Sequence, residues 1–467
     1  MLHNDSISLC MIIKNEEQYL GQCLDKIKDY VSEIVIVDTG STDKSKEIAK
    51  RYTDKIYDFA WCNEFAKARN FSISKATHEW ILILDADEII LEFNKRKVTN
   101  FINLHNEQKV VGRVKIINLF EEMNETKKSM TYISRLFNKR FFHYEGSIHE
   151  QVVSKDNSKY KVKPVEMTIE HLGYLDEIMN KKNKYERNIS LLKSAIQDNV
   201  DDPYYHYQLG KSYYKAQQYK RALGSFKRAI SLCNNFEYEY AQDLVESYGY
   251  ALLKCEKYVE AIELKSYQKY YDQSPDYNFI MGLIYMNNGK FEDAIDAFKK
   301  CIGGYEGKVE GISSYQPNYN IGVIYQALGD TEEAIRFYKE CGEYLPAQKQ
   351  VKELLKQDIK RLVNDNQLEK AKKIFKENKK ALKDDVDTCS MRAVIAMMDG
   401  EMDKAETILL EGEKLNGEDF NLLYNLAYVY HHTNHIDRAI LYYEKALQNA
   451  DNKVNADEVY KILEILK

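Results

Sequence analysis

The chain has 467 residues, which is too long for one ordinary domain, so we expect two or three. Its 44% hydrophobic and 30% charged content is typical of a soluble globular protein, and its net charge of −6 argues against a nucleic-acid-binding surface. No apolar run approaches the ~20 residues of a membrane span, and the first residues lack the basic start and apolar core of a signal peptide.

The cysteine and tyrosine residues carry further information. Eight cysteines are scattered without C-x-x-C spacing, which argues against a zinc site or a disulfide framework and predicts reduced thiols in the cytoplasm. Tyrosine is unevenly distributed, because 28 of the 37 residues lie beyond residue 200. This shift in composition predicts a domain boundary between residues 175 and 203.

Short apolar runs alternate with helical patterns through the first part of the chain. Asn15 is a suitable N-cap, and Glu16 and Glu17 would then lie in the first turn of a helix. The alternation predicts a mainly parallel sheet with helices on both faces. The predicted strands are residues 8–13, 34–38, 55–59 and 81–84, and the predicted helices follow residue 15 and cover 45–52 and 65–76.

Polar clusters follow three of these strands, at residues 14–17, 38–43 and 85–88. Ligands of such sheets bind at the carboxyl ends of the strands, where these clusters should meet. If the fourth strand continues to its end, Asp85 and Asp87 project from the same face and suit a divalent cation. An isolated D-x-D is usually only a polar strand end, but three converging clusters favour a ligand site.

The clusters resemble the motifs of the inverting family 2 nucleotide-sugar glycosyltransferases, which have the GT-A fold. The resemblance covers about residues 6–174, and a glycine-rich G-x-G-x-x-G loop is absent. It implies a domain at residues 1–174 that takes a UDP-sugar. The matching motifs are Lys14-Asn15-Glu16-Glu17, Val37-Asp38-Thr39-Gly40-Ser41-Thr42-Asp43, Ala66-Lys67-Ala68-Arg69-Asn70 and Leu84-Asp85-Ala86-Asp87-Glu88.

Donor-binding residues follow from this resemblance. It implies that Asp38 meets the uracil or its ribose and that Arg69 and Asn70 bind the donor. Glu16 should lie beside the nucleoside, although stabilisation of a helix dipole explains it equally well. Arg135 could bridge to a donor phosphate or the acceptor, or it could pair with a nearby acid.

The resemblance also implies a divalent cation, Mn²⁺ or Mg²⁺, which would act as a Lewis acid on the leaving nucleoside diphosphate. Asp87 should coordinate the metal, and Asp85 should contact ribose and, through water, the metal. His171 ends the last predicted strand and could supply a further metal or pyrophosphate ligand. A histidine satisfied at an interface is the alternative.

The second half of the domain contains the candidate base. Residues 110–118 and 132–138 are strand-like, and the polar residues 121–128 predict a surface turn between them. His149 and Glu150 then resemble a His-Glu pair in the branch of the family that modifies peptides and proteins. An inverting transfer needs a base for the acceptor proton, and Glu150 is our first choice ahead of His149. A structural role for the pair remains open.

Residues 175–202 predict a linker helix, and residues 203–467 predict an all-α repeat array. Small and aromatic residues recur at offsets of 12, 16 and 19 from Gly210, Gly282 and Gly322. These offsets resemble the tetratricopeptide helix–turn–helix unit of ~34 residues, and six or seven such units would stack into a solenoid. Most tyrosines should pack between helices, while some should line a peptide-binding face.

Three hypotheses about function follow. This domain order resembles bacterial enzymes that glycosylate flagellin or glycopeptide bacteriocins, with a Ser/Thr hydroxyl or a Cys thiol as acceptor and UDP-GlcNAc or UDP-glucose as donor. The repeats would bind the polypeptide acceptor, a flagellin or a secreted peptide. Alternatively, the enzyme builds cell-envelope saccharide and uses its repeats for scaffolding or to form a homodimer. The third hypothesis, a scaffold with an inactive domain, fits poorly with intact Asp38, Asp85 and Asp87.

Overall fold

The computed structural model describes residues 6–122, 125–172, 178–383, 385–450 and 453–467. Two compact units make up the chain, residues 1–317 and 318–467. The first unit contains the α/β domain together with the first helical repeats, and the predicted boundary at residue 174 lies outside the described residues. Among the described residues, no helix is both long enough and apolar enough to cross a membrane.

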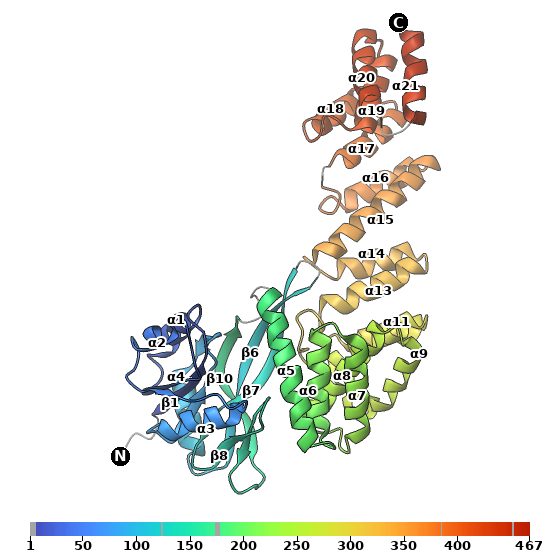
Figure 1. Cartoon of the computed structure of the whole chain (residues 1–467). Helices are drawn as coiled ribbons and strands as arrows, with labels where there is room; N and C mark the ends of the chain where they lie inside the picture. The colour runs from blue at the N-terminus through green and yellow to red at the C-terminus, as the bar shows by residue number, and fades with distance from the viewer. Residues whose placement is uncertain (1–5, 123–124, 173–177, 384, 451–452) are drawn as a thin grey trace. The chain divides into compact units, whose positions relative to one another are not determined.

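An eight-stranded mixed sheet forms the centre of the α/β domain (Figure 1). Its strand order is β3-β2-β1-β4-β7-β6-β10-β5, and the first four of these strands are parallel. This confirms the predicted α/β fold with a parallel half-sheet. The strands are β1 (Ile7–Ile13), β2 (Glu33–Asp38), β3 (Ile56–Asp58), β4 (Trp80–Ile83), β5 (Glu88–Phe93), β6 (Val110–Glu122), β7 (Glu125–Asn138) and β10 (Lys161–His171), with β8 (Phe142–Glu145) and β9 (Gln151–Ser154) in a separate hairpin.

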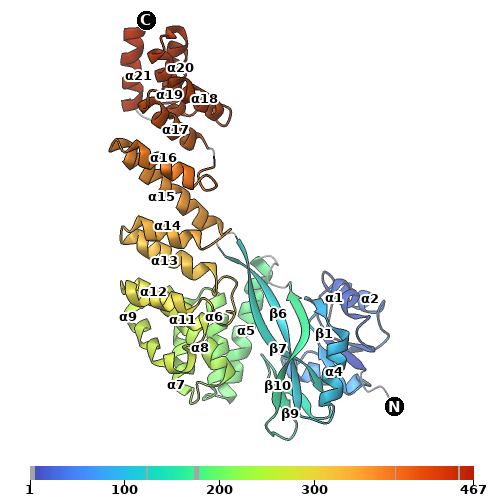
Figure 2. The same cartoon turned by 180° about the vertical axis from the view of Figure 1, so that it is seen from behind.

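Helices cover both faces of the sheet, because successive strand residues point to opposite sides. Leu9 of β1 packs with α1 (Leu20–Ile27) and α4 (Lys95–His105), whereas Cys10 packs with α3 (Phe65–Lys75). Figure 1 shows α3 in front of the sheet, and Figure 2 shows α4 from the opposite side. The short helix α2 (Ser45–Ala49) follows β2.

Two predicted details of this domain are wrong. Helix α1 begins at Leu20, and Asn15 does not cap it, because Asn15 has a left-handed backbone (φ 58°) and its side chain accepts a hydrogen bond from Thr42. Residues 121–128 are not mainly a surface turn, since cross-strand pairs continue to Glu122 and Glu125. Long β-hairpins tolerate polar residues on an exposed face, so polarity alone does not mark the turn.

Glu33, the first residue of β2, connects several segments at the amino end of this strand. Its buried carboxylate accepts hydrogen bonds from Ser8 of β1, from Lys55 before β3 and from the backbone N–H of Thr77. Burial by itself would raise the pKa of Glu33, but these hydrogen bonds outweigh it and lower the pKa from 4.5 to about 2.

Glu33→Gln should therefore lower the free energy of unfolding by about 2–3 kcal/mol at pH 7. The folded-state pKa is depressed, so this stabilisation is present above about pH 4.5 and is lost as the pH falls towards 2. Urea unfolding followed by tryptophan fluorescence measures it, because both tryptophans, Trp61 and Trp80, lie in the α/β domain. A difference between wild type and variant that persists undiminished at pH 3 would contradict this origin.

Helix pairs recur through the described residues after the α/β domain, as the repeat offsets predict. In three pairs the glycine of the first helix lies against the aromatic ring of the second, since a Cβ built on Gly210 would meet Phe226 at 2.5 Å. Gly282 meets Phe298 and Gly322 meets Tyr338 in the same way. The aromatic ring thus packs against the glycine of its own helix pair.

The described helices of the first unit follow the linker helix α5 (Ile178–Asp198). They are α6 (Pro203–Lys215), α7 (Tyr219–Leu232), α8 (Glu239–Lys254), α9 (Tyr258–Ala261), the 3₁₀ helix η1 (Ile262–Tyr267), α10 (Gln268–Tyr271), α11 (Pro275–Asn287) and α12 (Phe291–Lys300). Helix α13 (Tyr315–Ala327) begins at the boundary. The second unit contains α14 (Thr331–Lys339), α15 (Leu345–Asn364), α16 (Leu368–Glu377), α17 (Val386–Met398), α18 (Met402–Glu413), α19 (Phe420–His432), α20 (Ile436–Gln448) and α21 (Lys453–Leu466).

Candidate active site

The loops after β1 and β2 are joined by hydrogen bonds at the carboxyl edge of the sheet. Asn15 donates its backbone N–H to Ser41 Oγ (3.0 Å), and its side-chain oxygen accepts from the N–H of Thr42 (2.8 Å). Glu17 and Asp43 make a second pair, because the N–H of Glu17 donates to Asp43 (3.0 Å). The first two predicted clusters therefore lie side by side, as the strand order requires.

Asp38 ends β2 and is buried beneath its own loop. Its carboxylate accepts hydrogen bonds from the backbone N–H groups of Gly40 and Ser41, and Lys46 Nζ lies 3.5 Å away. These contacts hold the loop after β2 in one conformation. Glu16 precedes α1, and its N–H donates to Ser45 Oγ (2.7 Å). The roles of both acids toward a nucleoside stay predictions.

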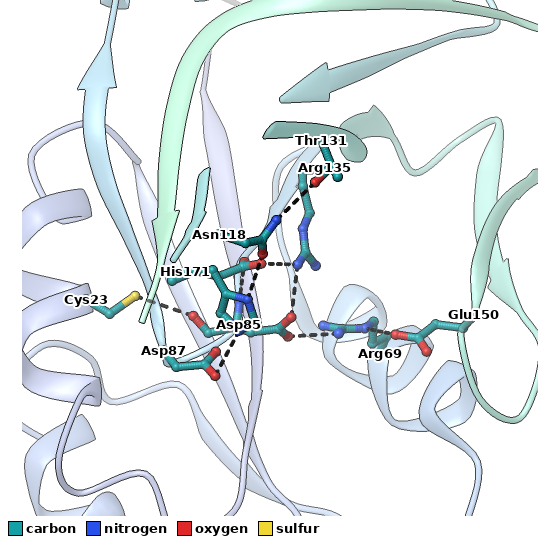
Figure 3. A network of polar contacts seen from close by, with 10 residues as sticks. Cys23, Arg69, Asp85, Asp87, Asn118, Thr131, Arg135, Glu150 and His171 are labelled. Atoms are coloured by element: carbon teal, nitrogen blue, oxygen red, sulfur yellow. Dashed lines mark hydrogen bonds and ion pairs between the residues drawn. The ribbon is translucent and has the colours of Figure 1, made fainter. Parts of the chain in front are cut away.

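The third polar cluster, residues 85–88, does not continue strand β4, although the predicted pairing of Asp85 with Asp87 requires this. Strand β4 ends at Ile83, and Asp85 begins a tight turn in which the N–H of Glu88 donates to the carbonyl of Asp85 (3.1 Å). The Glu88 side chain accepts in return from the N–H of Asp85 (2.9 Å). The alternation of a strand is lost here, so Asp85 and Asp87 reach different partners (Figure 3).

Asp85 lies between two arginines. Arg69 of α3 donates to one carboxylate oxygen of Asp85 (2.8 Å), and Arg135 of β7 donates to the other (2.9 Å). Arg69 also donates through Nε to Glu150 (2.5 Å), and Arg135 donates to the buried Glu88. These five charged side chains form one network, which we call the Asp85 network. Figure 3 shows Asp85 with Arg69, Arg135 and Glu150.

The electrostatics of the Asp85 network favour the ionised form of Asp85, whereas burial raises the pKa of Glu88. Burial alone would raise the pKa of Asp85, but the two guanidinium groups outweigh it and hold that pKa well below its usual range. Two donors of the network, Arg69 Nη1 and Arg135 Nε, are buried and have no hydrogen-bond partner among the described residues. An unsatisfied buried donor lowers the stability of the fold by about 1–3 kcal/mol, and such donors call for an explanation such as a functional role.

Asp87 faces His171 at the end of β10. Their Oδ2 and Nε2 atoms are 3.1 Å apart, and the other ring nitrogen of His171 is 3.1 Å from Asn118 Oδ1. The N–H of Leu172 also donates to the Asp87 carbonyl (2.9 Å). The structure therefore brings together two of the three predicted metal ligands, which are far apart in sequence.

The three side chains differ in how well they suit the divalent cation that the resemblance implies. A carboxylate and a neutral imidazole held by a further polar group are suitable ligands, so Asp87 and His171 fit. Both oxygens of Asp85 are engaged by arginine, so its coordination of a metal stays a prediction that these ion pairs do not favour. Within the described ranges, no group of three or more His, Cys, Asp or Glu side chains could hold a metal ion.

The candidate bases His149 and Glu150 follow β8 in a bend rather than a strand. Glu150 reaches Arg69 and thus the Asp85 network. His149 has a left-handed backbone (φ 54°), and its buried Nε2 has no hydrogen-bond partner in the part of the chain that the structure describes. Burial, followed by the charges of Lys215 and Lys211, lowers the pKa of His149 to about 4, so the ring is neutral at pH 7. Only Glu150 has a described contact with the network.

Two residues of the site have roles that were not predicted. Asn70, a predicted donor ligand, exchanges hydrogen bonds with the backbone of Tyr144 (2.8 and 2.9 Å) and so fastens α3 to β8. Glu88 was quoted in its motif without a role, yet it closes the turn and pairs with Arg135. The sequence feature that could have indicated a role for Glu88 is a carboxylate directly after a D-x-D. Its partner Arg135 lies in β7, the strand next to β4.

Comparison with known families agrees with this geometry. A model described as "Glycosyl transferase family 2" matches residues 8–163. Tetratricopeptide repeat models match residues 203–236, 275–303, 315–344 and 420–453, and each of these ranges contains a helix pair described above.

Several curated proteins are similar to part of the chain. A "TPR repeat-containing protein" from Synechococcus elongatus is 31% identical over 214 residues, which cover 44% of this chain and 51% of that protein. The "SPbeta prophage-derived glycosyltransferase SunS" from Bacillus subtilis is 28% identical, with 50% of this chain and 54% of SunS covered. An "uncharacterized glycosyltransferase" of Rickettsia typhi is 25% identical and covers 32% of this chain and 52% of the relative.

The chain spans about half the length of these curated relatives. The matched ranges, the parallel half-sheet and the glycine–aromatic helix pairs nevertheless agree on its two parts. The chain therefore combines an N-terminal domain of glycosyl transferase family 2 with C-terminal tetratricopeptide repeats.

Proposed function

We propose that the protein transfers a sugar from a UDP-sugar to a Ser/Thr or Cys side chain of a polypeptide, with inversion and with the help of a divalent cation. The observation that carries this proposal is the grouping of Asp38, Asp87 and His171 with the Asp85 network at the carboxyl edge of a family 2 domain. In parallel sheets this edge is where nucleotides bind.

The donor would lie across the loops after β1, β2 and β4. Asp38 is held by the N–H groups of its own loop and would face the nucleoside. Arg69 and Arg135 carry positive charge next to the diphosphate, and Asp85 keeps both guanidinium groups in place. Fixed charges of this kind stabilise a leaving group without reorganisation during the reaction.

Asp87 and His171 are the residues that would hold Mn²⁺ or Mg²⁺. When bound, the cation would supply Lewis-acid stabilisation for the departing nucleoside diphosphate. Asn118 keeps the ring of His171 oriented through its second nitrogen, a contact that typically matters to a metal-binding histidine.

Glu150 is the proposed general base for the acceptor hydroxyl or thiol. It is largely buried, with 11% of its side chain exposed, and it is connected to the donor side through Arg69. A base must lie within hydrogen-bond reach of the proton that it takes, and Glu150 is the member of the His149–Glu150 pair on the side of the network. The repeats would bind the polypeptide, since solenoids present extended binding surfaces.

Intact-mass spectrometry tests this function directly. The full chain with Mn²⁺ is incubated with flagellin or peptide acceptors and either UDP-glucose or UDP-GlcNAc. The expected result is an acceptor mass increase of one hexose or one N-acetylhexosamine, which an Asp87→Asn variant does not produce. Transfer to saccharide acceptors but never to a polypeptide would contradict the proposal and favour the cell-envelope alternative.

A further inference from the structure

Residues 146–151, the loop after β8 together with the first residue of β9, contact both the catalytic domain and the repeats. The one acid of this segment, Glu150, accepts a hydrogen bond from Arg69 Nε at 2.5 Å, inside the catalytic domain. Two residues earlier, Ile148 is 3% exposed and belongs to the buried cluster of the repeats, together with Leu192 of α5 and Tyr207 of α6. Ile148 is thus held by the repeats, and Glu150, two residues later, is held by the catalytic domain.

Polar contacts between the loop and α6 accompany this burial. Gln151 donates to the hydroxyl of Tyr204 (2.8 Å) and to the carbonyl of His149 (2.9 Å). A Cβ placed on Gly146 would lie 3.6 Å from the hydroxyl of Tyr205, so α6 also approaches the start of the loop closely. The first repeat therefore lies close to this segment at Gly146, Ile148 and Gln151.

The backbone of the loop depends on these contacts. Gly146 and His149 both have positive φ (102° and 54°), and a left-handed conformation is unfavourable for histidine unless its surroundings impose it. The carbonyl of Ser147 accepts from the N–H of Phe65, the first residue of α3, the helix that carries Arg69. Loop conformation and the position of Arg69 are therefore connected through the backbone.

From this geometry we propose that the first tetratricopeptide repeat positions Glu150 against Arg69, with Ile148 as the anchoring residue. The first repeat is then a part of the active site and not only a surface that captures the acceptor. Ile148 and Tyr204 are positioning residues in this assignment, because they act through Glu150. The expected effect on kcat rests on the proposed function. The anchoring of the loop can be measured without any enzyme activity.

The test uses the full chain and the hydrolysis of UDP-glucose and UDP-GlcNAc in the presence of Mn²⁺. Ile148→Ala should lower kcat about tenfold or more and change KM less than twofold, because small misplacements of reacting groups are costly. Ile148→Val should restore kcat to within about twofold of wild type. Tyr204→Phe removes only the hydroxyl that accepts from Gln151 and should lower kcat about threefold, which keeps the test usable if Ile148→Ala folds poorly.

A double-mutant cycle separates positioning from general destabilisation. In a Glu150→Gln background, Ile148→Ala should have no further effect on kcat, because Ile148 acts through Glu150. Full additivity of the two effects would overturn the proposal, as would a wild-type kcat in Ile148→Ala. The matched control is Leu441→Ala, which truncates a 50% exposed residue of α20 and should leave kcat unchanged.

Hydrogen exchange of the full chain provides the activity-independent result. Ile148→Ala and Tyr204→Phe should speed the exchange of amides in residues 142–152 and at the start of α3, and Leu441→Ala should not. Unchanged exchange in both loop variants would overturn the anchoring. If the wild-type protein turns over no UDP-sugar, the proposed function fails, and the exchange result alone decides whether the repeat holds the loop.

Discussion

Replacing Asp87 with asparagine should lower the turnover of a UDP-sugar about 100- to 1000-fold and leave the fold intact. The substitution keeps the size of the side chain but removes the charge that faces His171 at 3.1 Å, and with it the anionic ligand proposed for the cation. Asp87 makes no described contact with the Asp85 network, so its loss should not disturb that network. Hydrolysis assays across a Mn²⁺ titration measure the effect.

The control for this variant is Asp54→Asn, a neutralisation of the same kind at an exposed position outside the site. It should retain the activity of the wild type. Circular dichroism of both variants should match that of wild type. Full turnover by Asp87→Asn would contradict the metal-assisted mechanism, and so would wild-type turnover that EDTA leaves unchanged. Either result would assign Asp87 a structural role beside His171.

Replacing Arg69 with methionine should have the largest effect on stability. Arg69 is 6% exposed and holds two carboxylates, those of Asp85 and Glu150, which the substitution would leave without their shared partner. Removing one member of a buried ion pair typically costs about 3–5 kcal/mol, because the remaining charge is buried and uncompensated. We expect a loss of this size in the unfolding free energy of the α/β domain, together with loss of donor turnover.

Urea unfolding followed by tryptophan fluorescence measures this loss, since both tryptophans report on the α/β domain. Arg51→Met removes an exposed arginine and should change the unfolding free energy by less than about 0.5 kcal/mol. Arg69→Lys should be intermediate, because an ammonium group cannot reach both acids with the geometry of a guanidinium. Stability of Arg69→Met equal to that of wild type would show that the network contributes no net stabilisation.

The helix pairs illustrate what a repeated pattern can predict. Gly210, Gly282 and Gly322 each precede an aromatic residue by 16 positions, and each glycine meets that ring in the structure. The contact is local, within one helix–turn–helix unit, so spacing along the chain is enough to identify it. The strands of the parallel half-sheet were predictable for the same reason, because each is a short apolar run bounded by polar turns.

The D-x-D motif shows where such local reasoning fails. Period-two alternation predicted that Asp85 and Asp87 would act as a pair, but the chain turns directly after Ile83. The partners of Asp85 come from α3 and β7, and the partner of Asp87 comes from β10. These partners lie 16, 50 and 84 residues from their acids, so the tertiary fold decides which side chain meets which acid, and no pattern within the motif contains that information.

The amino-acid sequence by itself determined the two-part organisation, the order of strands and helices, the edge at which the polar clusters gather and the repeat unit. These features depend on apolar periodicity and turn residues, which are properties of neighbouring positions. Only the tertiary structure decided that Asp85 is held by two arginines, that Asp87 faces His171, and that the loop carrying Glu150 is buried against the first repeat. Those contacts join residues that are distant in sequence, and packing of the whole unit, rather than any local preference, brings them together.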